Sequence, residues 1–431
     1  MANPRLCALE ALRRTRKDAA FSNIVLDAVL QESDLNRGDR AFATAIYYGV
    51  LERSKTLDYM ISKLCNSGSN KIAPMVAECL RIGLYQIKYM DKVPQSAAVN
   101  ETVKMVRKKC TSATGFVNAI LRRACREDIA LPQGDTPEDM SILYSCDVSI
   151  AECLIKDLGI GAAREFLKAS LEAAPIYIRV NTLKITPEEL VEKLNELGIE
   201  AKKTNIPEAL MIKGIGSVEK NPLYAEGLFH VEDLAAQWAV KSLCPKSGER
   251  VLDMCSAPGG KAFSAAEYMG DKGEIKAFDL YENRVGLIQS GAERLGISII
   301  SASSGDSSVF NESLGEFDAV LCDVPCSGIG IIRRKPDIKY KSVSDFGSLP
   351  ELQYSILSNG ARYLKKGGRL VYSTCTLRKE ENGEVAARFL KEHPEFKPLK
   401  VDIGGEKLSE KTFLPQNDET DGFYVAVFIK E

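Results

Sequence analysis

Residues 317 to 328 read Phe317-Asp318-Ala319-Val320-Leu321-Cys322-Asp323-Val324-Pro325-Cys326-Ser327-Gly328. Their apolar run is typical of a buried parallel strand, and an acid, a proline and a cysteine follow that run. A second apolar run, Arg369-Leu370-Val371-Tyr372, ends in Ser373-Thr374-Cys375-Thr376. Because ligands bind outside the carboxyl ends of strands in open α/β sheets, the two stretches predict a site with two cysteines.

Strand and helix patterns alternate on both sides of these stretches. Helical patterns over residues 261–269, 282–295 and 350–364 separate the candidate strands, which are Arg250–Met254, Glu274–Asp279, Ile297–Ala302, Phe317–Cys322, Arg369–Tyr372 and Tyr424–Ile429. We therefore predict that residues 226–431 form an α/β Rossmann-like domain with a doubly wound parallel sheet.

The N-terminal half predicts two further domains, so that the protein as a whole is multidomain. Residues 1–135 carry helical periodicity, for example over 74–89 and 96–107, and predict an all-α helical bundle. Residues 138–225 mix strand patterns at 176–180 and 209–212 with a helix that the capping sequence Thr186-Pro187-Glu188-Glu189 begins. This mixture predicts a small α+β module.

Composition limits the class of protein. The 431 residues are 45% hydrophobic and 27% charged, and no apolar run is long enough for a transmembrane helix. We expect a cytoplasmic protein with no membrane partner. None of the twelve cysteines forms a Cys-x-x-Cys pair, and the two histidines lie near no cysteine pair. We therefore expect no metal site and reduced core thiols, with Cys79, Cys153 and Cys244 as examples.

Charge is distributed unevenly along the chain. Residues 1–130 hold 21 Lys and Arg against 13 Asp and Glu, whereas the remainder holds 36 against 46. A basic segment on an acidic body indicates a phosphate-binding module. A second basic strip, formed by Arg333, Arg334, Lys335, Lys339 and Lys341, follows Cys326, and we expect it to hold phosphates. A solvated basic surface without a partner is the alternative interpretation.

A glycine loop at Asp253-Met254-Cys255-Ser256-Ala257-Pro258-Gly259-Gly260-Lys261 ends the first candidate strand and begins a helix. The helix N-terminus favours an anion, but the dinucleotide and phosphate-loop patterns are absent, so a carboxylate suits the loop better than a pyrophosphate. Asp279 ends the second strand, where an acid suits ribose hydroxyls. An amino-acid carboxylate plus a ribose indicates S-adenosylmethionine, with a tight packing turn as the alternative.

These motifs together resemble the RNA cytosine-C5 methyltransferase family, in particular its branch that acts on bacterial 16S ribosomal RNA. The stretches Ile331–Ile338 and Thr420–Tyr424 strengthen the resemblance, and residues 1 to about 140 are similar to a transcription antitermination factor. The resemblance implies that Cys375 is the nucleophile and that Cys326 assists product release. It also implies cofactor contacts from Cys255, Ser256, Ala257, Pro258, Gly259, Gly260, Lys261, Asp279, Asp306 and Asp323.

The chemistry explains why such residues are needed. Carbon 5 of cytosine is a poor nucleophile until a thiolate adds to carbon 6, and Asp323 is placed to manage the charge at ring nitrogen 3 if it holds a proton. The target cytosine must be unpaired or flipped out of a duplex. Two alternatives stay open: a cytosine-C5 methyltransferase acting on transfer RNA, and a non-catalytic RNA-binding factor.

Overall fold

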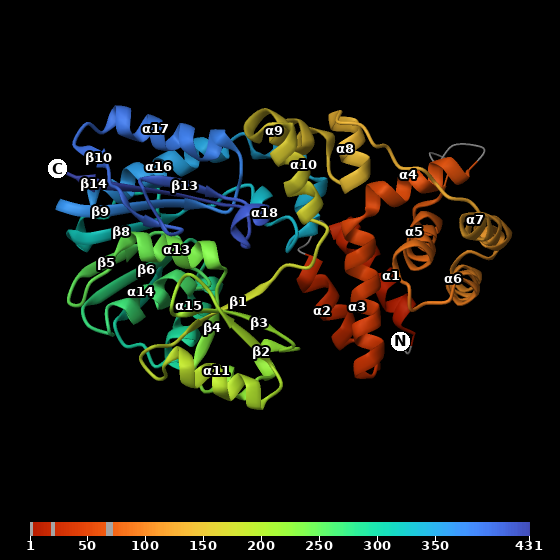
Figure 1. Cartoon of the computed structure of the whole chain (residues 1–431), viewed down its shortest axis with the longest axis horizontal. Coiled ribbons are helices and arrows are strands. Elements are labelled where there is room, and N and C mark those ends of the chain that lie inside the picture. Colours follow the sequence, from red (N-terminus) through yellow and green to blue (C-terminus); the bar gives the residue numbers. More distant parts are fainter. Residues whose placement is uncertain (1–2, 19–21, 66–71) are drawn as a thin grey trace. The chain divides into compact units, whose positions relative to one another are not determined.

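The computed structural model describes residues 3–18, 22–65 and 72–431 (Figure 1). Residues 1–2, 19–21 and 66–71 of the predicted helical domain lie outside the described residues. The chain forms two compact units, the first from residues 1–172 and 332–343 and the second from 173–331 and 344–431. Within the described ranges, no helix is both long enough and apolar enough to cross a membrane.

The first unit is an all-α bundle, as predicted. Its helices are α1 (Pro4–Asp18), α2 (Ser22–Gln31), α3 (Arg37–Glu52), α4 (Ser54–Leu64), α5 (Pro74–Tyr89), α6 (Gln95–Lys109), α7 (Thr114–Arg126), α8 (Pro137–Tyr144), α9 (Val148–Leu158) and α10 (Ile160–Ala169). Helix α5 is buried along most of its length, and Cys79, Leu80 and Leu84 on it are fully enclosed. One apolar cluster joins helices α1 to α7 around it.

Helices α8 to α10 belong to this first unit, although the sequence prediction assigned residues 138–225 to a middle module. The unit also includes residues 332–343, which follow the Cys326 stretch in the chain. Tyr340 in this segment donates a hydrogen bond to the Leu51 carbonyl over 2.5 Å and accepts one from the Ser54 backbone N–H over 3.1 Å. The unit is therefore completed by a segment that is distant in sequence.

The prediction that Lys339 holds phosphate in a basic strip is wrong. Lys339 is fully buried in the first unit, and its Nζ donates to the Tyr144 carbonyl over 3.3 Å. Burial lowers the pKa of this ammonium to about 8. Exposed cations of the strip remain at Arg334, Lys335 and Lys341.

The second unit begins with the small α+β module that the sequence predicts. Its antiparallel sheet has the order β2-β3-β1-β4, with β1 (Ile176–Val180), β2 (Glu200–Lys203), β3 (Ala209–Lys213) and β4 (Phe229–Val231). Helix α11 (Pro187–Glu196) starts with the predicted capping box, in which Thr186 and Glu189 satisfy each other's backbone N–H groups. Helix α12 (Pro222–Ala225) is a short turn before β4.

A sheet of eight strands forms the rest of the second unit. Its main path has the order β10-β14-β9-β8-β5-β6-β7, and β13 pairs with β14. The strands are β5 (Arg250–Asp253), β6 (Glu274–Asp279), β7 (Ile300–Ser304), β8 (Phe317–Asp323), β9 (Leu364–Thr374), β10 (Phe396–Pro398), β13 (Glu410–Phe413) and β14 (Phe423–Lys430). A separate hairpin joins β11 (Val401–Ile403) to β12 (Glu406–Leu408).

The direction of the last strand corrects the prediction of a wholly parallel sheet. Strands β5 to β9 are parallel, but β14 pairs with β9 in the antiparallel direction, and so do β10 and β13 with β14. Between β13 and β14 lies only the short helix α18 (Pro415–Asp418), which is too short for a crossover connection. The sheet is consequently mixed.

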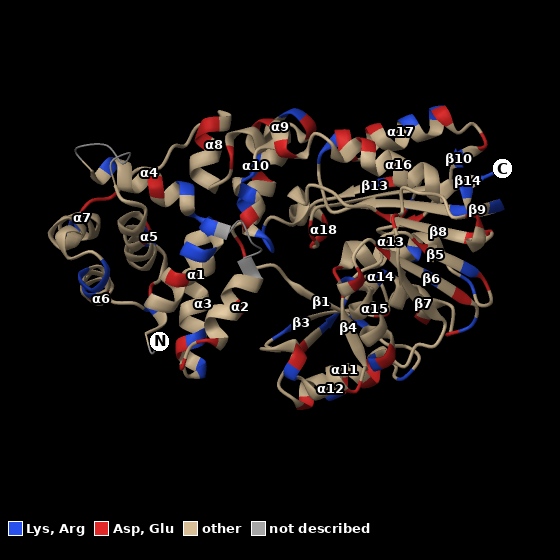
Figure 2. Ribbon diagram, turned by 180° about the vertical axis from the view of Figure 1, so that it is seen from behind, with Lys and Arg blue, Asp and Glu red and all other residues tan. Residues whose placement is uncertain are grey.

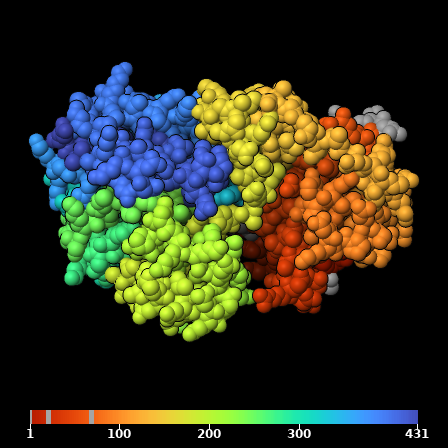
Figure 3. All heavy atoms as spheres, viewed as in Figure 1, coloured from red at the N-terminus to blue at the C-terminus, as the bar shows by residue number. Residues whose placement is uncertain are grey.

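Helices cover both faces of the large sheet (Figure 1), and alternate residues of its strands face two apolar layers. Ala319 and Leu321 face the layer of α13 (Leu234–Leu243), α14 (Gly260–Tyr268) and α15 (Glu282–Leu295). Val320 and Cys322 face the layer of α16 (Leu349–Arg362) and α17 (Gly383–Glu392). In Figure 3 the atoms of the small sheet, in yellow-green, adjoin those of the large sheet and its helices, in green and blue. Both sheets therefore belong to one body.

All twelve cysteines are free thiols, but not all of them lie in the core. Cys79 is buried as expected and Cys153 is half-buried. Cys244 is exposed, because it ends α13 in a left-handed conformation with φ of 50°. The interpretation of Cys244 as a core thiol is therefore wrong.

We expect Tyr340→Phe to destabilise the first unit by about 1–3 kcal/mol, since the change leaves buried hydrogen-bonding groups without a partner. Thermal and urea unfolding of the full chain measure this loss. Tyr59→Phe is the control, because Tyr59 is only half-buried and its ring centroid lies 5.1 Å from the Lys63 ammonium. Equal stability of the two variants would contradict the assignment.

Candidate active site

The two predicted cysteines meet at the carboxyl edge of the large sheet. Strands β8 and β9 are parallel, and their register places Asp323 opposite Ser373. The chain continues from these residues to Cys326 and Cys375, whose sulfur atoms lie 3.2 Å apart. Two thiols at this distance share a proton readily, because only one of them can ionise without strong like-charge repulsion.

A glycine pair holds the Cys326 loop against the Cys375 loop. The Gly330 N–H donates to the Cys375 carbonyl over 3.0 Å, and the Gly422 N–H donates to the Gly330 carbonyl over 2.9 Å. A Cβ atom at Gly330 would lie 2.0 Å from the Gly422 carbonyl oxygen. Gly330 thus has no room for a side chain.

Glu381 is a buried anchor that the sequence analysis missed. Its carboxylate accepts from the Ser327 N–H over 2.8 Å, from Gln353 Nε2 over 2.9 Å and from Arg378 Nη1 over 2.9 Å. Gln353 also donates to the Pro325 carbonyl over 2.9 Å. These bonds fix both sides of Cys326. The charged run Arg378–Glu381, three residues past Cys375, was the available signal, since charge beside a buried strand end needs partners.

Asp323 is paired with a lysine from the glycine loop. Lys261 Nζ lies 2.7 Å from Asp323 Oδ2, and Ser373 Oγ donates to Asp323 Oδ1 over 2.8 Å. Burial opposes the charge of Lys261, but the carboxylates of Asp323 and Glu232 hold the pKa of this ammonium above its usual range. The site therefore offers a cation beside Asp323, where the sequence prediction considered only a protonated acid.

The thiol of Cys326 is held in its protonated form. Its hydrogen bond with Cys375, its burial and the negative charge of Cys375 raise the pKa of Cys326 well above the ordinary value. The nearby carboxylates of Glu381 and Asp323 act in the same direction. Cys326 can therefore donate its proton to the Cys375 sulfur, 3.2 Å away.

The glycine loop fits the carboxylate and amino group of an amino-acid ligand. Gly259 has φ of 109° and caps α14, and a Cβ there would lie 2.4 Å from the Phe263 ring. Asp253, at the end of β5, is fully buried, and neither of its carboxylate oxygens has a hydrogen-bond partner. Burial raises its pKa to about 7. Such an acid, which lies directly before the loop, fits an ammonium or sulfonium group.

Asp279 lies at the end of β6, as predicted, and is buried. Its Oδ2 lies 2.9 Å from Arg284 Nη1, and Arg284 Nη2 also donates to the Ala257 carbonyl over 2.7 Å. Arg284 thus joins the predicted ribose acid to the glycine loop, and a ribose there would share the carboxylate with this guanidinium.

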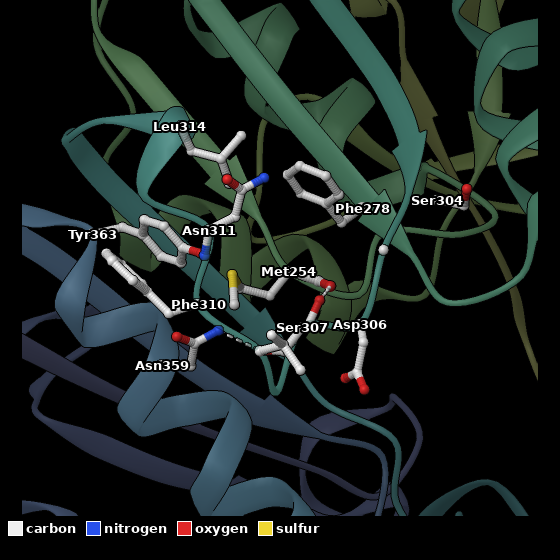
Figure 4. A pocket seen from close by; sticks show the side chains of 12 residues that line it. Met254, Phe278, Ser304, Asp306, Ser307, Phe310, Asn311, Leu314, Asn359 and Tyr363 are labelled. Atoms are coloured by element: carbon white, nitrogen blue, oxygen red, sulfur yellow. Dashed lines mark hydrogen bonds between the residues drawn. The ribbon is translucent and has the colours of Figure 1, made fainter.

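A cavity of about 300 Å³ lies beside these strand ends (Figure 4). Met254, Phe278, Phe310 and Tyr363 give it apolar walls, and the loop from Ser304 to Ser307 forms part of its rim. Asn359 lines it with a buried Oδ1 that accepts no hydrogen bond, while its Nδ2 donates to the Ser307 carbonyl over 2.7 Å. Apolar walls with one unpaired acceptor suit a purine ring that carries an amino group.

Asp306 lines the same cavity and is exposed. Its carboxylate accepts from the Ser308 N–H over 2.9 Å and from Ser308 Oγ over 2.6 Å, and these bonds lower its pKa. Asp306 therefore combines a turn role with a position at the cavity. Asn359, Phe310 and Tyr363 were missed, because helix and loop residues far from the glycine motif carry no local signal of the cavity.

Comparisons with known protein families cover nearly the whole chain. Residues 240–429 match the family described as 16S rRNA methyltransferase RsmB/F. Residues 2–126 match the NusB family, and residues 150–219 match the ferredoxin-like domain of RsmF/B-like methyltransferases.

Relatives and solved structures agree with these matches. The probable ribosomal RNA small subunit methyltransferase B of Bacillus subtilis (strain 168) is 37% identical, and the alignment covers 98% of this chain and 98% of the relative. The Klebsiella pneumoniae ribosomal RNA small subunit methyltransferase B is 32% identical over 99% of this chain and 98% of its own. The crystal structure of PH0851 covers 100% of this chain and 99% of its own, with a TM-score of 0.82 at 27% identity. A methyltransferase homologue from Pyrococcus horikoshii covers 69% of this chain and 100% of its own, with a TM-score of 0.62 at 30% identity.

We expect Asp253→Asn to stabilise the protein more at pH 8 than at pH 5. Burial raises the pKa of Asp253 to about 7, so the folded state binds more protons than the unfolded state between about pH 4 and 7. The contribution of Asp253 to the free energy of unfolding consequently falls as the pH rises through that window. Replacing it by Asn abolishes this fall, which amounts to at most about 4 kcal/mol. Unfolding midpoints of both proteins at the two pH values test this. A difference between them that is independent of pH would contradict it.

Proposed function

Since the chain belongs to the 16S rRNA methyltransferase RsmB/F family, we propose that it methylates carbon 5 of a cytosine in 16S ribosomal RNA, with S-adenosylmethionine as the methyl donor. The family membership confirms the resemblance drawn from the motifs. The observation that carries the catalytic proposal is the 3.2 Å contact between Cys326 and Cys375 beside the Lys261–Asp323 ion pair. The RNA substrate places the activity in the cytoplasm.

Cofactor binding divides among four parts of the site. The N-terminus of α14 would hold the methionine carboxylate, and Asp253, whose oxygens have no partner, would accept from the amino group. Asp279 would accept from the ribose hydroxyls, and the cavity lined by Asn359, Phe310 and Tyr363 would hold the adenine. When bound, S-adenosylmethionine supplies an electrophilic methyl group on a sulfonium.

Cys375 begins the reaction as the nucleophile. Its thiolate adds to carbon 6 of the cytosine, a carbon–sulfur bond forms, and the electron pair of the ring double bond moves toward nitrogen 3. The Lys261 ammonium, held 2.7 Å from Asp323, stabilises that charge. Carbon 5 then has enamine character and forms a bond to the methyl group, while the methyl–sulfonium bond breaks with its electron pair going to sulfur.

Cys326 completes the reaction as a thiolate: it first releases its own proton to water and then accepts the proton from carbon 5. The electrons of that C–H bond restore the C5–C6 double bond and expel the Cys375 thiolate. Before the reaction, the neighbouring Cys375 sulfur opposes ionisation of Cys326. Once Cys375 is bonded to carbon, that repulsion is gone, so Cys326 becomes a better base at the step that needs one.

RNA binding is assigned to the first unit. The last turn of α6 presents Arg107, Lys108 and Lys109, all exposed, and Figure 2 shows the Lys and Arg colour gathered on this helix. These cations suit phosphates and fit the excess of basic residues in 1–130. A cytosine held in a duplex could not reach sulfur atoms recessed at the sheet edge, so the target is unpaired or flipped.

The two cysteine variants should behave differently. Cys375→Ala removes the nucleophile, so that no methylation and no covalent complex form. Cys326→Ala permits attack and methyl transfer but blocks release, so a protein–RNA adduct should accumulate and survive denaturation. Denaturing gels with radiolabelled RNA and S-adenosylmethionine read both outcomes. Cys244→Ala, at an exposed thiol, is the control. An adduct from Cys375→Ala alone would reverse the two roles, and full activity in both variants would exclude the covalent mechanism.

Neutralising the last turn of α6 should flatten the salt dependence of RNA binding. Each lost phosphate contact removes about 0.7–0.9 from the slope of log affinity against log salt, so Arg107→Gln, Lys108→Gln and Lys109→Gln together should remove about 2. The triple variant is preferable to deletion of residues 1–135, because deletion would also strip the packing partners of Tyr340. Arg388→Gln, which breaks ion pairs to Glu351 and Glu392, is the control. An unchanged slope would remove α6 from the RNA interface.

A further inference from the structure

A series of charged groups, buried from Arg179 to Glu232 and half-buried at Lys261 and Asp323, leads from the small sheet to the proposed catalytic site. Its members alternate in sign and come from elements that are far apart in sequence. They are Arg179 on β1, Glu267 on α14, His230 on β4, Glu232 directly after β4, Lys261 on α14 and Asp323 on β8. The reaction as derived above uses only the last two.

The first half of the series lies between the small sheet and α14. Arg179 and His230 face each other across the β1–β4 pair, where two cations side by side would repel. Glu267 separates them, with Oε2 2.6 Å from Arg179 Nε and Oε1 3.5 Å from His230 Nδ1. The Arg179 guanidinium also lies over the Tyr268 ring, 4.1 Å from its centroid.

The second half reaches the glycine loop. Glu232 Oε2 lies 3.5 Å from His230 Nε2 and accepts from Ser264 Oγ over 2.5 Å. Glu232 Oε1 has no hydrogen-bond partner and lies 3.3 Å from where a Cβ at Gly260 would be. Gly260 therefore leaves room for this carboxylate beside Lys261, in addition to any approach of a ligand to its backbone.

The protonation states of His230 and Glu232 agree with the alternation of positive and negative charge along the series. Burial opposes a charge on His230, but Glu232 and Glu267 outweigh it and raise the pKa of His230 to about 9. Burial likewise opposes the charge on Glu232, while His230 and Lys261 lower its pKa. At neutral pH His230 and Lys261 are therefore cations and Glu232 between them is an anion. Asp253 and Asp323 also face Lys261, and Cys255 faces Asp253.

We propose that His230 and Glu232 are positioning residues, which hold the Lys261 ammonium beside Asp323 and set the charge that the target cytosine meets. The inference rests on the proposed function, because the charge it explains is that of the Lys261–Asp323 pair, which the proposed reaction uses at the cytosine adduct. Neither residue touches the reacting atoms; each acts through Lys261.

The proposal predicts opposite effects for opposite changes of charge. His230→Gln leaves a surplus negative charge, which makes the carboxylates of the site harder to ionise. Glu232→Gln leaves a surplus positive charge, which makes them easier to ionise. The double variant loses one charge of each sign. A purely structural role predicts a loss of activity in every variant without shifts in opposite directions.

The experiment is the pH dependence of kcat/KM for methylation of transcribed 16S ribosomal RNA by the full chain. The acidic limb of the profile should move up by about 0.5–1.5 pH units in His230→Gln and down by a similar amount in Glu232→Gln. The double variant should return to within about 0.3 units of the wild type. His393→Gln, which changes the other histidine, near Phe389 and Glu395, should cause no shift.

A second readout separates this inference from the proposed function. Calorimetry of S-adenosylmethionine binding across the same pH range should show the same opposite shifts, because Asp253 faces Lys261. Shifts in the same direction, or none, in both readouts would overturn the inference. A wild type that methylates no cytosine would overturn the proposed function, while opposite shifts in calorimetry would still support the charge series. Should His230→Gln fail to fold, Glu232→Gln and the double variant decide the outcome.

Discussion

The parallel pairing of β8 with β9 is the constraint on which the site depends. The register sets Cys322 opposite Tyr372 and Asp323 opposite Ser373, so both chains leave the sheet at the same level and deliver their cysteines together. Apolar layers on both faces maintain this register, because Ala319 and Leu321 face one layer and Val320 and Cys322 face the other. A slip by one residue would exchange the two sets of side chains between the layers.

Buried charge is arranged in pairs around that edge. Arg378 lies against Glu381, Lys261 against Asp323 and Arg179 against Glu267, so that each desolvated group is compensated. Asp253 departs from the pattern, since neither of its oxygens has a partner. An isolated buried acid destabilises a protein, and its position at the glycine loop indicates that it is retained for a ligand.

The path of the chain links the catalytic loop to the helical unit. Six residues after Cys326 the chain enters the first unit, where residues 332–343 bury Lys339 and bond Tyr340 to the groups at the junction of α3 and α4. Residues 1–172 alone therefore leave that part of the unit incomplete. The loop that carries Cys326 is anchored at its other end by Gly330 and Glu381. Both ends of the connection thus rest on buried hydrogen bonds rather than on surface contacts.

Local patterns in the sequence determined the three-part architecture, the strand ends that carry Asp323, Cys326 and Cys375, the glycine loop and the capping box at Thr186. Each of these depends on neighbours within a few residues, where hydrophobic period and backbone preference act directly. Only the tertiary structure decided the antiparallel direction of β14, the burial of Lys339, the partners of Asp253 and Asn359, and the approach of His230 and Glu232 to Lys261. These features arise where elements distant in sequence exclude water from one another, and desolvation, which sets the charge and the role of each such group, leaves no mark on the local sequence.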